Sequence, residues 1–439
     1  MRYARFYRTT LTKQAFVFTS LFAASGLTLS EEPETPPWDV SAPSYSAEVQ
    51  EIELSVTEGT WMNLDVSPDG QHIAFDLLGD IYQIPITGGE ATPLLSGHAW
   101  EIQPQYGPDG RFLAFTSDRN GADNIWVMDL TNPDNKHQIT HENFRLLNNP
   151  SWHPSGEYLV AKKHFTTSRS LGTGEVWLYD ANVDQALTRG NLHGSVLVKR
   201  PSPAFQKELG EPTFSADGES VFYIQNTTPG NTFIYHQDSN GEVMAIKRYD
   251  LETGEIEKVV GGAGGAVRPT PSPDGKTLAF VKRVRAASRL FVMDLASGEQ
   301  TMLVDDLDPD MQETWAVQGA YPTMAWTPDG DSIVYWSQGH IWRVDVASGE
   351  SRQIPFSVND TRTAYPAVEV AVDVAPDTLT TTMPRFATQS PDSQSVAFES
   401  MGRLYLKRNG EKAKRLTRDT AAAVEFSPAF SPDGKEVYY

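Results

Sequence analysis

Residues 106–129 read YGPDGRFLAFTSDRNGADNIWVMD, a tight turn followed by two short hydrophobic runs. In the turn, Pro108 presets φ for the first corner, Asp109 can bond the backbone ahead of it, and Gly110 accepts positive φ where the chain resumes. The two runs that follow are rich in aromatic and β-branched residues and are separated by polar residues. The stretch therefore predicts an antiparallel pair of strands entered through a tight turn.

The same turn recurs along the chain and divides it into similar repeats. Its copies are Ser67-Pro68-Asp69-Gly70, Gly107-Pro108-Asp109-Gly110, His153-Pro154-Ser155-Gly156, Ser215-Ala216-Asp217-Gly218, Ser272-Pro273-Asp274-Gly275, Thr327-Pro328-Asp329-Gly330, Ser390-Pro391-Asp392-Ser393 and Ser431-Pro432-Asp433-Gly434. The first two turn glycines are 110 − 70 = 40 residues apart, which suits one four-stranded blade. Ser393 lacks the freedom of glycine, so the seventh turn should be the least regular.

These repeats predict an all-β protein, a β-propeller of four-stranded antiparallel blades over residues 51–439, with a solenoid as the alternative. Seven complete repeats and the start of an eighth are visible, because Tyr439 falls inside the second strand of the last repeat. The propeller is therefore expected to be incomplete at its C-terminus, as in a truncated protein. Residues 52–56 are expected to supply the outermost strand of the last blade, which would close the ring and cover its edges.

Composition excludes several classes of function. The formal net charge is −21, from 36 basic and 57 acidic residues, which argues against nucleic acid as a partner because phosphate binding needs clustered cations. The chain has no cysteine, so disulfides, thiolate metal sites and a cysteine nucleophile are excluded.

The N-terminus resembles an export signal. Residues 1–26 combine a basic start, a short apolar core and small residues at the end, and residues 27–50 are rich in proline and predict an extended linker. We therefore expect a periplasmic or secreted protein that has no membrane span after removal of the signal.

The longest insertions fall between the second and third strands of the repeats, on the rim opposite the Pro-Asp-Gly turns. Two of them are basic, and variable loops on a rigid scaffold often bind ligands or partners. The candidate binding face consists of Lys162, Lys163, His164, Arg169, Lys282, Arg283, Arg285 and Arg289. An acidic ligand or partner domain would suit it; the alternative is that these cations pair locally with Asp and Glu.

Motifs of catalysis are missing from the sequence. It contains no Gly-x-Ser-x-Gly elbow and no His-x-His or His-Glu-x-x-His. The acidic run between Asp305 and Glu313 has no partner motif for a metal and is expected to be a solvated connection between two blades. No catalytic residue, metal ligand or cofactor site is predicted in this chain.

The turn followed by Ala-Phe and then Ile-Trp-Val-Met-Asp resembles the propeller of TolB-like proteins over about residues 60–439. A narrower resemblance is to the start of large exported proteins of the amidohydrolase family, in which such a propeller precedes a metal-dependent hydrolase barrel. The segments that match are PPWDV (36–40), TEGTWM (57–62), DLLGDIY (76–82), GAVRP (265–269) and DMQETW (310–315). The barrel's metal ligands have no matching positions here.

This resemblance implies a non-catalytic module that serves a catalytic domain outside this chain, by docking, substrate gating or assembly. The implied partner is that domain or another protein, and zinc would be the divalent metal of the domain, not of this chain. Two alternatives stay open. One is a TolB-like periplasmic scaffold for protein interactions, and the other is the propeller of a serine peptidase of the prolyl oligopeptidase type.

Overall fold

A computed structural model of the chain describes residue 40 and residues 49–169, 171–182, 190, 193–235, 237–238, 240–365, 372–418 and 424–439. The predicted signal peptide, residues 1–26, lies outside these residues, and so does the predicted linker apart from residues 40, 49 and 50. The described residues form strands and contain no helix, so none that could cross a membrane occurs among them. The chain divides into two compact units, Met1–Pro366 and Ala367–Tyr439.

The first unit contains six four-stranded antiparallel sheets and one three-stranded sheet, and in each four-stranded sheet the strands follow one another in chain order from the inside outward. The first three blades consist of β2 (Leu64–Val66), β3 (His72–Leu77), β4 (Asp80–Pro85) and β6 (Thr92–Leu95); β7 (Glu101–Tyr106), β8 (Phe112–Ser117), β9 (Asn124–Asp129) and β10 (Asn132–Gln138); and β11 (Leu147–Trp152), β12 (Tyr158–Thr166), β13 (Gly172–Asp180) and β14 (Ser195–Val198).

The next three blades repeat this order. They consist of β15 (Leu209–Phe214), β16 (Ser220–Asn226), β17 (Met244–Asp250) and β18 (Ile256–Val260); β19 (Val267–Pro271), β20 (Thr277–Val284), β21 (Ala287–Asp294) and β22 (Gln300–Val304); and β23 (Ala325–Trp326), β24 (Ser332–Ser337), β25 (His340–Asp345) and β26 (Ser351–Ile354). The prediction of an all-β propeller of four-stranded antiparallel blades is confirmed by these sheets.

The recurring turn connects the first two strands of each blade through the same backbone hydrogen bonds, and in most blades a side-chain bond between its first and third residues is added. In the first blade, Ser67 Oγ donates to Asp69 Oδ1 at 2.6 Å and accepts from the backbone N–H of His72 at 2.9 Å. Gly70 takes φ of 71°. In the seventh repeat Ser393 adopts φ of 60°, and Ser390 still bonds Asp392 at 2.6 Å. The expectation that this turn is irregular is wrong, because the Ser–Asp bonds hold it in the same conformation.

The ring closes after six blades, because the sixth packs against the first. Trp336 donates its indole N–H to the carbonyl of Gly59 at 2.7 Å, and its ring lies 6.1 Å from the ring of Trp61. Thr323 Oγ1 accepts the backbone N–H of Leu64 at 2.8 Å. One hydrophobic core runs through these contacts and joins the sixth blade to the first.

The predicted extent of the propeller, residues 51–439, stays a prediction beyond the six sheets of the first unit. All the predicted repeats exist as sheets, but the seventh and the start of the eighth belong to the second unit. That unit contains one four-stranded sheet and one two-stranded sheet. Their strands are β28 (Arg385–Gln389), β29 (Ser395–Ser400), β30 (Arg403–Arg408) and β31 (Lys414–Arg415), and β32 (Ala429–Phe430) and β33 (Val437–Tyr438).

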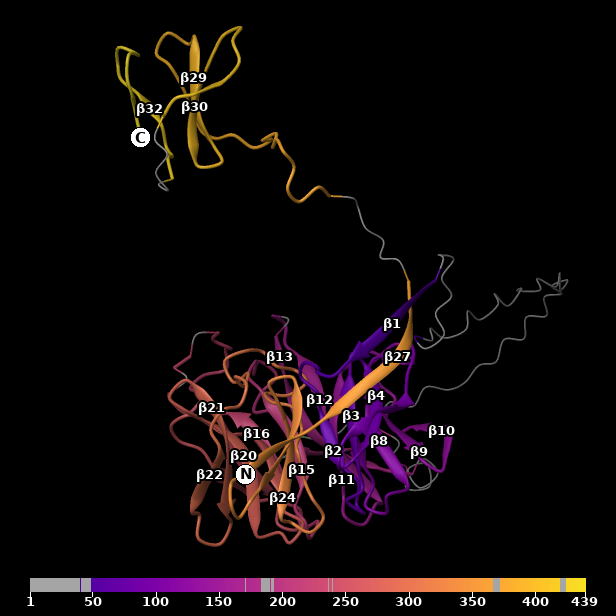
Figure 1. The fold of residues 1–439 in the computed structure, drawn as a ribbon. Coiled ribbons are helices and arrows are strands. Elements are labelled where there is room, and N and C mark those ends of the chain that lie inside the picture. Colours follow the sequence, from indigo (N-terminus) through magenta and orange to yellow (C-terminus); the bar gives the residue numbers. More distant parts are fainter. Residues whose placement is uncertain are drawn as a thin grey trace, which may run out of the picture. The chain divides into compact units, whose positions relative to one another are not determined.

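The N-terminal strand does not complete the last blade either, contrary to the prediction. Instead β1 (Gln50–Val56) runs antiparallel to β27 (Phe356–Ala364), and Figure 1 shows the two side by side as a long ribbon. The start of β27 also pairs in parallel with the short strand β5 (Gly89–Glu90). The sixth blade has its own outer strand, β26, so its last position is already filled when the chain reaches β27.

We expect a protein shortened to residues 49–365 to be a monomer that unfolds in a single cooperative transition, because its ring is closed without the second unit. The replacement Trp336→Ala should lower its stability by about 3–5 kcal/mol, since it removes a buried indole from the contact between the sixth and first blades. Size-exclusion chromatography shows whether the shortened protein is a monomer, and calorimetry measures its unfolding transition and the loss of stability in the variant. Separate melting transitions in the unmutated protein would contradict closure of the ring.

Candidate functional site

A bulge in the inner strand of blades two to five directs one side chain toward the channel. At this point Gln103, Asn149, Glu211 and Arg268 adopt φ between 49° and 58°, each is followed by proline, and the pairing register shifts there. A non-glycine residue in the left-handed region costs about 1–2 kcal/mol. Contacts of these side chains must offset that cost in four successive blades.

The four side chains bond one another across the blades. Glu211 accepts the backbone N–H of Arg268 at 2.6 Å, and the two side chains form an ion pair at 3.2 Å with both nearly buried. Arg268 Nη1 also donates to Asn149 Oδ1 at 3.2 Å. The backbone N–H of Asn149 donates to Gln103 Oε1 at 2.7 Å. A continuous polar network therefore joins blades two to five around the channel.

The connection from β22 to β23, residues 305–324, closes one end of the channel; we call it the plug. Its carbonyl oxygens accept hydrogen bonds from several blades: Val317 O from Lys162 Nζ at 2.6 Å, Gln318 O from Gln103 Nε2 at 2.8 Å, and Tyr321 O from Arg268 Nε at 2.8 Å. In return, the backbone N–H of Ala320 donates to Glu211 Oε1 at 2.6 Å. The plug thus provides hydrogen-bond partners for the polar side chains that the bulges direct inward.

A buried ion pair anchors the first half of the plug to the fifth blade. Arg283 and Asp310 meet at 2.7 Å with side chains 8% and 0% exposed, and Arg283 also pairs with Glu313. Ser288 Oγ donates to Asp310 Oδ2 at 2.7 Å. The sequence predicted a solvated connection here, and this is wrong for Asp310, whose carboxylate is enclosed by partners from β20 and β21.

Lys162, from the predicted binding face, lies inside the ring. It pairs with Glu208 at 2.5 Å, and the two side chains are 1% and 2% exposed. Burial raises the pKa of Glu208 to about 7 although Lys162 opposes this shift. The desolvation of this carboxyl therefore outweighs its attraction to the lysine.

The other predicted cations do not gather into one patch. Lys163 pairs with Glu142 and Arg283 belongs to the plug anchor, whereas Lys282 donates to Gln300 at 3.3 Å and Arg289 contacts Met302 at 3.1 Å. Arg169 and Arg285 are exposed on separate hairpins. The local-pairing alternative thus describes Lys162, Lys163 and Arg283.

His164 is buried beside the plug and has no hydrogen-bond partner on either ring nitrogen. Its ring lies 5.4 Å from that of Trp315 in a T-shaped contact. Burial lowers the pKa of His164 to about 3, and Lys162, Arg145 and Arg200 lower it further. The imidazole is therefore neutral, so it cannot contribute charge to an anion site.

Sequence reasoning missed Gln103, Asn149, Glu211 and Arg268. Each lies six residues before the third residue of the recurring turn and directly before a proline. This repeated spacing was a usable signal, since a polar residue before proline in an inner strand marks the bulge. The same pattern does not indicate which residues face this polar side chain across the channel.

On the other side of the bulge ring, the channel widens into a cavity of about 280 Å³. Asp65, Ser151, Thr213 and Thr270 contribute polar groups to its lining. Because the recurring turns lie at this end and the plug lies at the other, the cavity opens toward the face of the turns. We call it the channel cavity.

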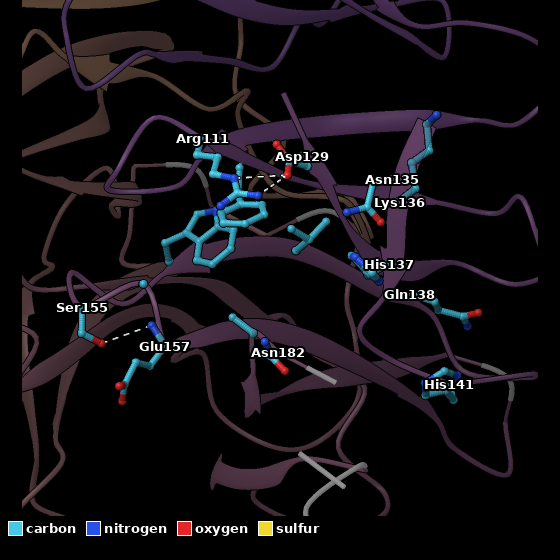
Figure 2. Close-up of a pocket in the computed structure, with 15 residues that line it drawn as sticks. Arg111, Asp129, Asn135, Lys136, His137, Gln138, His141, Ser155, Glu157 and Asn182 are labelled. Carbon is cyan, nitrogen blue, oxygen red and sulfur yellow. Dashed lines mark hydrogen bonds and ion pairs between the residues drawn. The ribbon is translucent and has the colours of Figure 1, made fainter. Parts of the chain in front are cut away.

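A second hollow of about 670 Å³ lies between blades two and three. Figure 2 shows Arg111 directed at Asp129 within it, and the two pair at 2.6 Å. Hydrogen bonds from Arg111 and Thr131 hold the pKa of Asp129 well below its usual range. Because this carboxylate is already paired, the hollow offers Lys136, His137 and amide groups rather than a reactive constellation.

Metal binding finds no support within the residues that the structure describes. No three His, Asp or Glu side chains among them come together as a set that could hold an ion. The zinc that the amidohydrolase resemblance implies belongs to a catalytic domain outside these residues and stays a prediction.

The closed ring and its plugged channel define a β-propeller. No family model matches the chain. It is 27% identical over 228 residues to the uncharacterized peptidase YuxL of Bacillus subtilis, covering 51% of this chain and 28% of the relative. It is 24% identical over 259 residues to dipeptidyl aminopeptidase BIII of Pseudoxanthomonas mexicana, covering 52% of this chain and 36% of the relative.

Among solved structures, TolB from Acinetobacter baumannii is similar at 15% identity and a TM-score of 0.49, covering 69% of this chain and 66% of that chain. The chain matches only about a third of the length of the two curated relatives, 28% and 36%. The propeller fold itself follows from the six sheets and their closure.

Replacing Lys162 by Met should destabilise the protein by about 3–5 kcal/mol, because Glu208 would be left buried without its partner. Because burial raises the pKa of Glu208 in the folded protein, the protein loses stability as the pH rises from the pKa of this carboxyl in the unfolded chain toward its pKa in the folded protein. The loss should therefore be smaller near pH 5 than near pH 8. Lys163→Met, which breaks a more exposed pair, is the matched control in urea unfolding, and an equal loss in both variants would contradict this account.

Gly319→Ala should displace the plug. A Cβ at this position would clash with Arg268 Nη2, and φ is +121°. Gly298→Ala is the matched control, because its φ is also positive, +75°, but a Cβ there meets open space. We expect faster proteolysis within residues 305–324 in the first variant alone, mapped by mass spectrometry. Equal protection of the two variants would show that the plug is not held by this close approach.

Proposed function

We propose that the first unit is a non-catalytic propeller module of an exported hydrolase, and that it docks a catalytic domain and controls access to it. The observation that carries this proposal is the plugged channel. Side chains from four blades hold the plug, so the described residues at the bulge positions are engaged in that network and form no nucleophile with an acid–base partner. Two relatives with peptidase names, each matched over about a third of its length, support peptide hydrolysis as the activity of the protein that the module serves.

A histidine–serine contact in the third turn has the geometry of a turn and not that of a catalytic pair. His153 Nδ1 lies 2.8 Å from Ser155 Oγ, in the place of the Ser–Asp bond found in the first turn. Its other ring nitrogen faces the carbonyl oxygen of Gly218 at 3.2 Å. A serine nucleophile needs a histidine oriented by a carboxylate, and here a carbonyl takes that place.

The second candidate is the propeller of an amidohydrolase-family protein, and one observation favours it. Two of the segments that carry this resemblance, residues 265–269 and 310–315, contain Arg268, Asp310 and Trp315, which hold the plug in place. A matching sequence at these contacts would preserve the plug. A TolB-like scaffold for protein interactions remains the third candidate, and it shares the propeller fold and an exported location with the other two.

Assays of the purified chain test the proposal. We expect no hydrolysis of dipeptidyl p-nitroanilides or of cyclic amides above the buffer rate, with zinc or with a chelator, because the described residues hold no catalytic constellation. Sustained turnover that copurifies with the chain would refute a non-catalytic role. The complete coding region separates the candidates: a Gly-x-Ser-x-Gly segment supports the peptidase, and His-x-His on a barrel supports the amidohydrolase.

A further inference from the structure

The wall of the channel cavity is built from one position of each inner strand, two residues beyond the bulge position. The six residues are Asp65, Gln105, Ser151, Thr213, Thr270 and Ala325. Three of them are hydroxyl residues, and the hydroxyls of Ser151 and Thr213 lie 3.3 Å apart. Asp65 is the single carboxyl at this level of the wall.

Asp65 lies deep among protein atoms and is reached by solvent through the cavity. Its Oδ2 accepts the backbone N–H of Tyr106 at 2.7 Å, which bridges the first two blades. Burial raises the pKa of Asp65 to about 7, and only the backbone N–H groups of Tyr106 and Val66 act against this shift. No cation of the described residues compensates the carboxylate.

The charged groups around Asp65 do not change this. Arg268 is the cation of the cavity lining, and it is engaged by Glu211, Tyr321 and Asn149. Asp76 on the adjacent strand β3 accepts two bonds from Asn63, and Asp69 lies in the exposed turn. Neither of these carboxylates supplies a positive charge that could compensate Asp65.

We propose that the channel cavity binds a small organic cation through a primary ammonium group, which Asp65 and the hydroxyls of Ser151, Thr213 and Thr270 accept. An ammonium group has three donors and no acceptor, which matches a carboxylate surrounded by hydroxyl oxygens. Trp152, Phe214 and Trp326 also line the cavity and offer an apolar wall to the attached carbon chain. This inference does not depend on the proposed hydrolase partner.

The lining argues against a divalent metal ion in the same place. Calcium and magnesium take several oxygen ligands, usually with more than one carboxylate, and Asp65 is the single carboxyl of its ring. The volume of about 280 Å³ suits an alkyl diamine or the amino-terminal residue of a peptide. Both sources present the same ammonium group, so the test must separate them.

Calorimetric titration of the whole chain with 1,4-diaminobutane and with the dipeptide amide Gly-Val-NH₂ tests the proposal at near-physiological salt. Asp65→Asn keeps an acceptor for Tyr106 and removes the charge, so it should weaken binding about tenfold or more, the value of a hydrogen bond to a charged group. Glu51→Gln, an exposed carboxylate on β1, is the control for the general attraction of an acidic protein and should have no effect. Tighter binding of one ligand identifies the source.

Proton release provides a second readout that a structural role of Asp65 would not produce. Because the ammonium needs ionised Asp65, binding near pH 6 should release a proton, and affinity should rise toward pH 8. Titrations in two buffers of different ionisation enthalpy measure the release, which Asp65→Asn should abolish. Thr213→Val should weaken binding without changing the number of protons released.

Three results would overturn the proposal: no binding of either amine by the unmutated chain, equal affinity in the Asp65→Asn variant, or undiminished binding of N-acetylated Gly-Val-NH₂. A thermal melt of each variant verifies folding. If Asp65→Asn fails to fold, two other measurements decide the question: the affinity of the Thr213→Val variant for the amines, and the affinity of the unmutated chain for the acetylated ligand.

Discussion

The left-handed residue before proline in four inner strands is the constraint on which the channel depends. Each bulge turns a polar side chain toward the axis at a backbone cost that only tertiary contacts can offset. Hydrogen bonds among the four residues at the bulges offset this cost, and these residues also bond the plug. The four are Gln103, Asn149, Glu211 and Arg268. The inner wall of the propeller is therefore stabilised by polar contacts between blades, whereas the space between neighbouring sheets is filled by apolar packing.

Buried charge is the second feature of the molecule. Lys162 with Glu208, Arg268 with Glu211, and Arg283 with Asp310 are three ion pairs with little exposure. Such pairs add little net stability compared with apolar packing, but breaking one is costly. Since all three hold or face the plug, they specify one conformation of residues 305–324 and keep that end of the channel closed. Two cations that the sequence places on loops, Lys162 and Arg283, thus lie inside the protein.

Closure of the ring is a property of the first unit by itself. The contact of Trp336 with Gly59 and Trp61 joins its sixth blade to its first. The ribbon of β1 and β27 brings the entry and the exit of the propeller together. Arg362 on β27 fixes it to the first blade through Asp80 at 2.8 Å.

The amino-acid sequence alone determined the blades, because turn chemistry and the alternation of strands are local: Ser67, Asp69 and Gly70 form their turn from contacts within a few residues. It did not determine where the ring closes, since that depends on how the angles between successive sheets add up. Nor did it show that Lys162 and Arg283 turn inward, or that Asp310 and Asp65 lie in the interior. Those outcomes were decided by tertiary structure, because the burial and pairing of a charge depend on residues that are distant in sequence and meet only when six blades share one axis.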